Sequence, residues 1–187
     1  MTDTRTRLLE AAMSEFIEVG YAGTDTNRIA RRAGFAPQTF YRWFKDKATV
    51  LGEVLGVWDE AETAMWQAVL HDEHLTAAEL AQACVDNVRP FLMFRQQLRS
   101  VLQQVPELAA RRTQGRQALM QALAPLLAHR MDRETLGSLL VQIDLLGEAI
   151  ARGDFSDLGL SGSAALEALA RLIATLRGDE PALIPRV

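Results

Sequence analysis

Apolar residues recur every three or four positions along nearly the whole chain, which is the spacing of one face of an α-helix. Residues 5–19 show the pattern clearly, with Leu8, Ala12 and Phe16 on one side. The strict alternation typical of a half-buried strand nowhere runs long enough to predict one. The pattern therefore predicts an all-α chain of about nine helices.

Glycine, proline and capping residues set the expected helix ends. Gly20 closes the first helix, Asp25 caps the second and Pro37 opens the third. Asp46 caps a long fourth helix, and Pro90 should kink the fifth, because proline lacks the amide donor. The expected helices span residues 5–19, 26–33, 37–44, 47–69, 76–102, 106–112, 115–131, 133–152 and 163–177.

The second and third helices are short, and the three-residue turn 34–36 joins them. Two helices joined in this way match a helix-turn-helix, whose second helix enters the DNA major groove. Glutamine can pair with adenine, arginine can pair with guanine, and a threonine methyl can contact thymine. Helical spacing turns Phe40 and Phe44 inward. It leaves five residues for the flanks and the outward side, namely Gln38, Thr39, Tyr41, Arg42 and Trp43.

The charge distribution changes the picture that the net charge of −4 suggests. An acidic total argues against a nucleic-acid partner. Residues 26–47, however, hold six basic residues and one acid, Asp46. Because only a local patch has to meet phosphate, this excess favours DNA binding. The six basic residues are Arg28, Arg31, Arg32, Arg42, Lys45 and Lys47.

Composition excludes several other classes of protein. Apolar residues make up 49% and charged residues 24%, which is globular composition. The longest apolar stretch, residues 122–128, is far too short to span a bilayer. The N-terminus carries an acid and leads into an amphipathic pattern, so it is not a secretory signal. A lone Cys84 gives neither a disulfide nor a thiolate cluster. We therefore expect a cytoplasmic protein with no cofactor, no metal and no membrane partner.

Residues 24–47 resemble the TetR (tetracycline-repressor-like) family of transcriptional regulators. The spacing agrees across four helices, so the resemblance covers about residues 5–55. The chain departs from many members at Ala36, where serine often caps the recognition helix, at Trp43, often histidine, and at Ala48, often an acid. The matching positions are Phe16, Gly20-Tyr21, Ile29-Ala30, Ala33-Gly34, Thr39-Phe40-Tyr41, Phe44 and Lys47.

The resemblance implies a DNA-binding domain at residues 1–46 and a ligand-binding and dimerisation domain at 47–187, and no enzyme activity. The helix that starts at residue 47 would connect the two. Tyr41 and Trp43 can alternatively be packing residues, since large aromatic side chains are usually mostly buried. The resemblance implies phosphate contacts from Thr26, Asn27, Tyr41 and Lys47, and base contacts from Gln38, Thr39, Arg42 and Trp43.

The larger domain of the family usually encloses an effector pocket. Methionine and aromatic side chains adapt to apolar ligands, and a few polar groups would orient one. The alternative is that these residues simply fill the core, with Asp144 paired to an arginine or exposed to water. The segment 71–74, His-Asp-Glu-His, offers too few ligands for a metal site. The pocket candidates are Trp58, Met65, Cys84, Asn87, Phe91, Met120 and Asp144.

The last two helices of the family usually form a dimeric four-helix bundle. The helices at 133–152 and 163–177 carry more apolar surface than one small monomer needs. We therefore expect a homodimeric repressor that a small apolar or amphipathic effector releases from a palindromic operator. The alternatives are a ligand-binding or enzymatic helical domain without DNA function, and a regulator without a ligand. The expected dimer residues are Leu139, Ile143, Leu146, Ile150, Leu166, Leu169, Ile173 and Leu176.

Overall fold

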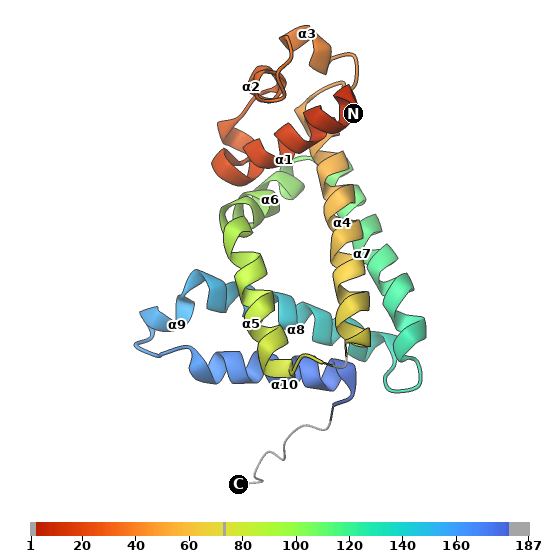
Figure 1. Ribbon diagram of the computed structural model, residues 1–187, viewed down its shortest axis with the longest axis vertical. Helices are drawn as coiled ribbons and strands as arrows, with labels where there is room; N and C mark the ends of the chain where they lie inside the picture. Colours follow the sequence, from red (N-terminus) through yellow and green to blue (C-terminus); the bar gives the residue numbers. More distant parts are fainter. Residues whose placement is uncertain (1–2, 73, 180–187) are drawn as a thin grey trace. The chain divides into compact units, whose positions relative to one another are not determined.

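The computed structural model describes residues 3–72 and 74–179, and all regular structure in those ranges is helical (Figure 1). The all-α fold class expected from the sequence is therefore confirmed. No helix in the described ranges is long and apolar enough to cross a membrane. The elements are α1 (Thr4–Gly23), α2 (Thr26–Arg32), α3 (Pro37–Phe40), α4 (Lys47–His71), α5 (Ala77–Val88), the 3-10 helix η1 (Arg89–Phe91), α6 (Leu92–Gln104), α7 (Pro106–Leu127), α8 (Arg133–Arg152), α9 (Asp154–Asp157) and α10 (Ser163–Arg177).

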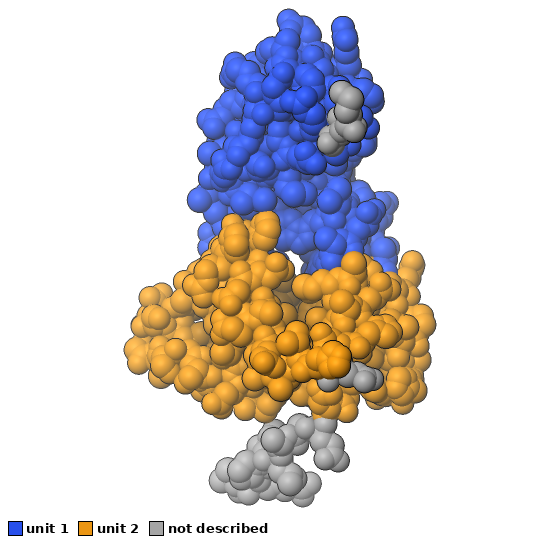
Figure 2. All heavy atoms as spheres, in the orientation of Figure 1, with its two compact units in different colours: residues 1–62, 93–118 blue, residues 63–92, 119–187 orange. Residues whose placement is uncertain are grey.

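The helices divide into two compact units (Figure 2). Unit 1 consists of residues 1–62 and 93–118, and unit 2 consists of residues 63–92 and 119–187. Most of α6 and the first half of α7 thus pack with the N-terminal helices. The helix-turn-helix therefore draws structural support from segments far beyond residue 46.

The core of unit 1 is built around phenylalanine side chains. Phe16 of α1, Phe40 of α3 and Phe94 of α6 are all fully or almost fully buried. The Phe94 ring stacks with Phe16 at 6.4 Å and with Trp58 of α4 at 5.2 Å between ring centroids. Each buried aromatic side chain stabilises the fold by about 1.5–3 kcal/mol, so this cluster fixes α1 and α3 on α4 and α6.

The core of unit 2 lies mainly among α5, α8 and α10. Five of the eight residues that we expected at a dimer surface are buried in this core within a single chain. They are buried because the apolar faces of α5, α8 and α10 pack against one another. The other three, Leu146, Ile150 and Leu166, are half-buried against the same core. The five buried residues are Leu139, Ile143, Leu169, Ile173 and Leu176.

Several helix ends differ from those expected. The recognition helix α3 ends at Phe40 and continues as a turn, and Pro90 lies in the separate 3-10 segment η1 where we expected one kinked helix. The expected break between residues 112 and 115 is absent, because α7 runs continuously past Gly115. A Cβ at Gly115 would collide with the Asp59 carboxylate, so close packing on α4 keeps this glycine inside a helix. Tertiary packing has overridden a weak local propensity.

Candidate DNA interface

Local hydrogen bonds define the start of each helix around the turn. Asp25 caps α2 by accepting a bond from the Arg28 amide at 2.8 Å, and Asp46 caps α4 by accepting one from the Thr49 amide at 2.8 Å. The recognition helix has no side-chain cap at Ala36 and relies on Pro37 in its first turn. Gly34 has φ 80°, a left-handed conformation that favours glycine and that the sharp α2–α3 turn requires.

The aromatic residues of the recognition segment separate into a buried and an exposed pair. Phe40 and Phe44 are buried in the unit 1 core, as helical spacing predicts. Tyr41 is 58% exposed and Trp43 is 47% exposed, so neither is a packing residue of this chain. Both side chains are therefore available to a partner.

Two of the four expected phosphate-binding residues meet in space. The Thr26 hydroxyl, at the first residue of α2, lies 2.8 Å from the Tyr41 hydroxyl just after α3. Either oxygen can donate to a phosphate, and such contacts fix the register of a protein on DNA. Asn27, next to this pair, is exposed, as are Gln38 and Arg42. We call the set Thr26, Asn27, Gln38, Thr39, Tyr41, Arg42 and Trp43 the recognition surface.

Lys47 has a structural role that sequence reasoning missed. Its ammonium donates to the Tyr21 carbonyl at 2.6 Å and to the Thr24 carbonyl at 2.8 Å, and it lies 4.1 Å from the Tyr21 ring centroid. Burial lowers the pKa of Lys47, and the charge of Asp25 opposes that effect. An ammonium has three N–H donors, and the two carbonyls use two of them. Lys47 therefore ties the start of α4 to the end of α1.

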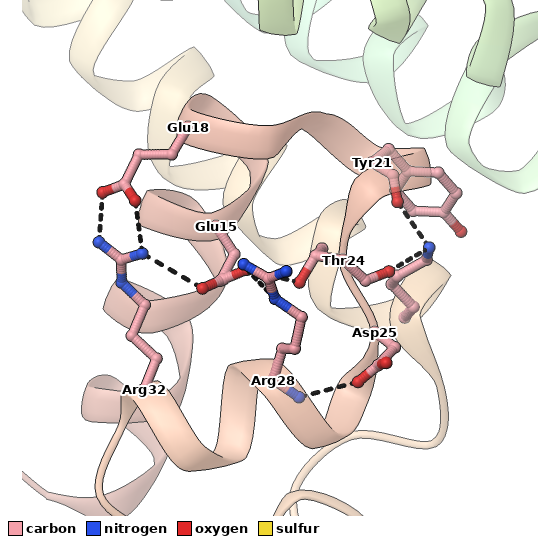
Figure 3. A network of polar contacts seen from close by, with 8 residues as sticks. Glu15, Glu18, Tyr21, Thr24, Asp25, Arg28 and Arg32 are labelled. Carbon is pink, nitrogen blue, oxygen red and sulfur yellow. Dashed lines mark hydrogen bonds and ion pairs between the residues drawn. The ribbon is translucent and has the colours of Figure 1, made fainter.

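A buried carboxylate also lies between α1 and α2 (Figure 3). Glu15 of α1 is only 4% exposed, and its carboxylate accepts three hydrogen bonds. Burial alone raises the pKa of Glu15, but the bonds from Thr24 and Arg32 and the charge of Arg28 outweigh it, so the pKa is lowered. Helical spacing gives a signal for this burial, since Glu15 follows Leu8 by two turns. The three donors are Thr24 Oγ1 at 2.8 Å, Arg28 Nε at 3.1 Å and Arg32 at 3.2 Å.

These contacts reduce the number of basic residues in 26–47 that are free to meet DNA. Arg28 and Arg32 pair with Glu15, and Arg32 also forms an ion pair with Glu18. Half of the six cations, counting Lys47, are therefore engaged within the chain. The other three are exposed to solvent, namely Arg31, Arg42 and Lys45.

Comparison with known proteins agrees with this geometry. Residues 8–54 match the model of the bacterial regulatory proteins of the tetR family. Over these residues the chain is similar to the TetR family. The uncharacterized HTH-type transcriptional regulator YdgC of Bacillus subtilis (strain 168) is 24% identical over 92 residues, which is 49% of this chain. The match spans about half (47%) of that relative's length.

Solved structures of bacterial regulators share the fold over nearly the full chain. The fatty acid degradation regulator FadR from Bacillus halodurans superposes with a TM-score of 0.66 and 17% identity, covering 96% of this chain and 98% of that one. FadR from Bacillus subtilis, in complex with stearoyl-CoA, gives a TM-score of 0.64 and 18% identity, covering 94% and 98%. At these identities the likeness shows the fold alone.

The expected effector residues are distributed over both compact units. Trp58 belongs to unit 1, where it stacks on Phe94. In unit 2, the Asn87 amide lies 4.0 Å from the Met65 sulfur, and Cys84 packs against the core. Burial raises the pKa of the Cys84 thiol to about 11, so the thiol is neutral. The remaining candidates, Phe91, Met120 and Asp144, also lie in unit 2 and are half-buried.

Residues 71–74, which we expected not to form a metal site, lie partly outside the described residues, because Glu73 is not among them. In the described part, the His71 ring contacts the Gln67 carbonyl at 2.6 Å, one turn back in α4. His71 thus lies at a helix end, where polar residues are common.

Proposed function

We propose that this protein is a TetR-family, sequence-specific DNA-binding transcriptional regulator in the cytoplasm, a repressor that a small effector releases from a palindromic operator. The observation that carries the proposal is the Thr26–Tyr41 hydroxyl pair at 2.8 Å, next to an exposed recognition segment. Tyr41 and Trp43 are large aromatic side chains that lie close together in solvent at this turn, as expected for a contact surface.

Within the recognition surface, the hydroxyls of Thr26 and Tyr41 and the amide of Asn27 bind phosphates. The third N–H of the Lys47 ammonium adds another phosphate contact. Gln38, Thr39, Arg42 and Trp43 read base edges in the major groove, where arginine pairs with guanine and glutamine with adenine.

A two-fold dimer supports the palindromic operator, since each half-site then receives one recognition helix. Val141 and Leu145 lie one turn apart on α8 and are 45% and 55% exposed. This apolar face, together with the half-buried residues Leu146, Ile150 and Leu166, is our proposed dimer contact. It replaces the five residues that the unit 2 core buries.

An apolar or amphipathic effector is supported by the stearoyl-CoA complex of FadR from Bacillus subtilis. Such a ligand would bind in unit 2, against Met65, Phe91 and Met120, with Asn87 or Asp144 orienting a polar group. It weakens operator binding only if it prefers the DNA-released conformation, and a coupling of about 1–3 kcal/mol lowers operator affinity about 5–150-fold.

The test is to recover DNA fragments that the purified protein enriches from its own genome and to measure binding against salt concentration. We expect a palindrome in the recovered fragments and an affinity that falls steeply with salt. Arg42→Ala should lose preference at one base pair per half-site, at a cost of about 1–3 kcal/mol. Arg133→Ala, a change on α8, is the matched control. If the protein binds no DNA fragment even at low salt, the proposal is refuted.

A further inference from the structure

Glu15 stands at the junction of the segments that present the DNA-binding residues. Its carboxylate, on α1, receives the Thr24 hydroxyl from the turn and the guanidinium groups of Arg28 and Arg32 from α2. Figure 3 shows these side chains converging from the two helices. A charge buried to 4% exposure costs several kcal/mol unless its partners are well placed, so the partners are held in a narrow geometry.

Thr24 is fixed from both sides. Its hydroxyl donates to Glu15 at 2.8 Å, and its carbonyl accepts from the Lys47 ammonium at 2.8 Å. Only Asp25, the cap of α2, separates Thr24 from Thr26. The position of the Thr26 hydroxyl, and hence its hydrogen bond to Tyr41, therefore depends on the Glu15 carboxylate.

The same carboxylate neutralises charge that the sequence offers to DNA. Arg28 and Arg32 direct their guanidinium groups at Glu15, and Arg32 forms a second ion pair with Glu18. Arg32 gives both of its terminal nitrogens to these carboxylates, whereas Arg28 uses only its Nε. Arg32 is therefore the cation least able to replace a counterion on DNA.

We propose that Glu15 is a positioning residue of the DNA interface: its carboxylate holds the Thr24 turn and α2 so that Thr26 and Tyr41 meet a phosphate, while Glu15 and Glu18 together keep Arg32 from binding DNA. The inference rests on the proposed function, because it assigns a role at that interface. Nothing in it depends on the operator sequence.

The proposal predicts the opposite change in DNA affinity to the one expected from net charge alone. Removing an acid from a DNA-binding domain reduces its repulsion from phosphate and should strengthen binding to any duplex. Removing Glu15 instead releases the turn, so we expect weaker binding although the protein becomes more positive. A fall in DNA affinity on removal of Glu15 would therefore support the positioning role, and a rise would support simple charge repulsion.

The experiment compares Glu15→Gln with Glu10→Gln, which removes the same charge from an exposed position on the same helix. Binding to a mixed-sequence duplex and to the enriched genomic fragments is measured over a range of salt concentrations. We expect Glu15→Gln to lower affinity roughly tenfold, the effect of losing about one charge-assisted hydrogen bond. Glu10→Gln should leave it unchanged or slightly raised. Stronger binding by Glu15→Gln would overturn the proposal.

Thr24→Val supplies a second variant that keeps the charge and the shape of the turn. It removes the hydroxyl that Glu15 accepts from and should weaken DNA binding in the same direction. Arg32→Gln should leave the salt dependence unchanged. A slope reduced by about one would show that Arg32 binds a phosphate and would contradict the second half of the proposal.

A double-mutant cycle distinguishes positioning from a general loss of stability. If Glu15 acts through Thr26, then Glu15→Gln should cost much less in a Thr26→Ala background than in the wild type. Circular dichroism at each salt concentration confirms that every variant is folded during the measurement. Additive effects would refute the positioning role. A wild-type protein that binds neither DNA would overturn the proposed function itself, which a defect confined to the variants would not.

Discussion

Lys47→Met should destabilise the protein even without DNA, because the Lys47 ammonium joins α4 to the end of α1. Its two hydrogen bonds, to the carbonyls of Tyr21 and Thr24, are 2.6 and 2.8 Å long. A hydrogen bond from a charged donor contributes about 1.5–3 kcal/mol, and its contact with the Tyr21 ring adds about 0.5–1 kcal/mol. Since Lys47 is half-buried and partly screened by solvent, we take about 2 kcal/mol for the whole arrangement.

Urea denaturation measures this loss, with the combined fluorescence of Trp43, Trp58 and Trp66 reporting on unfolding. Lys45→Met is the matched control, because it removes an exposed ammonium two residues away. We expect the Lys45 variant to unfold at the wild-type urea concentration and the Lys47 variant to unfold earlier. A Lys47 variant with unchanged stability and weakened DNA binding would show that this residue is a phosphate ligand alone.

Three further predictions concern stability and assembly. The lowered pKa of Glu15 means that its contribution is present above pH 4.5, the ordinary glutamate value, and is lost as pH falls through its folded pKa. The free energy of unfolding of Glu15→Gln should therefore fall less steeply than that of the wild type as the pH is lowered below 4.5. Gly115→Ala should destabilise, because the new methyl displaces the Asp59 carboxylate, whereas Gly137→Ala, with ordinary contacts, should stabilise by about 0.4–1 kcal/mol in thermal unfolding. Leu145→Glu should shift the protein from dimer to monomer in sedimentation, and an unchanged dimer would exclude this face of α8.

The helix-turn-helix could be predicted from sequence because its signals are local. Gly34 provides the left-handed turn, Pro37 starts the recognition helix, and Phe40 and Phe44 keep the helical period. These features depend on neighbours within one or two turns, where spacing and backbone chemistry decide the structure.

Which charges pair, and what covers each apolar helix face, depend on contacts between residues that are far apart in the sequence. Arg32 pairs with Glu18, fourteen positions away, which no short window of sequence can register. Leu169 and Ile173 have the same apolar spacing whether they face α5 of their own chain or a second copy. Burial in one chain was therefore indistinguishable from burial in a dimer until the structure placed them.

The internal pairing also bounds how strongly salt can act on DNA binding. If all six cations of residues 26–47 met phosphates, two copies would neutralise roughly twelve, and the logarithm of the binding constant would fall with a slope near −11 against log salt. Because Glu15 and Glu18 hold Arg32, the other five cations in each copy can meet roughly ten phosphates, and the slope is then near −9. Less of the affinity then comes from sequence-independent attraction. The contacts of Gln38 and Arg42 with bases consequently make up a larger share of operator binding, and loss of geometry at the Thr24 turn becomes correspondingly more damaging to specificity.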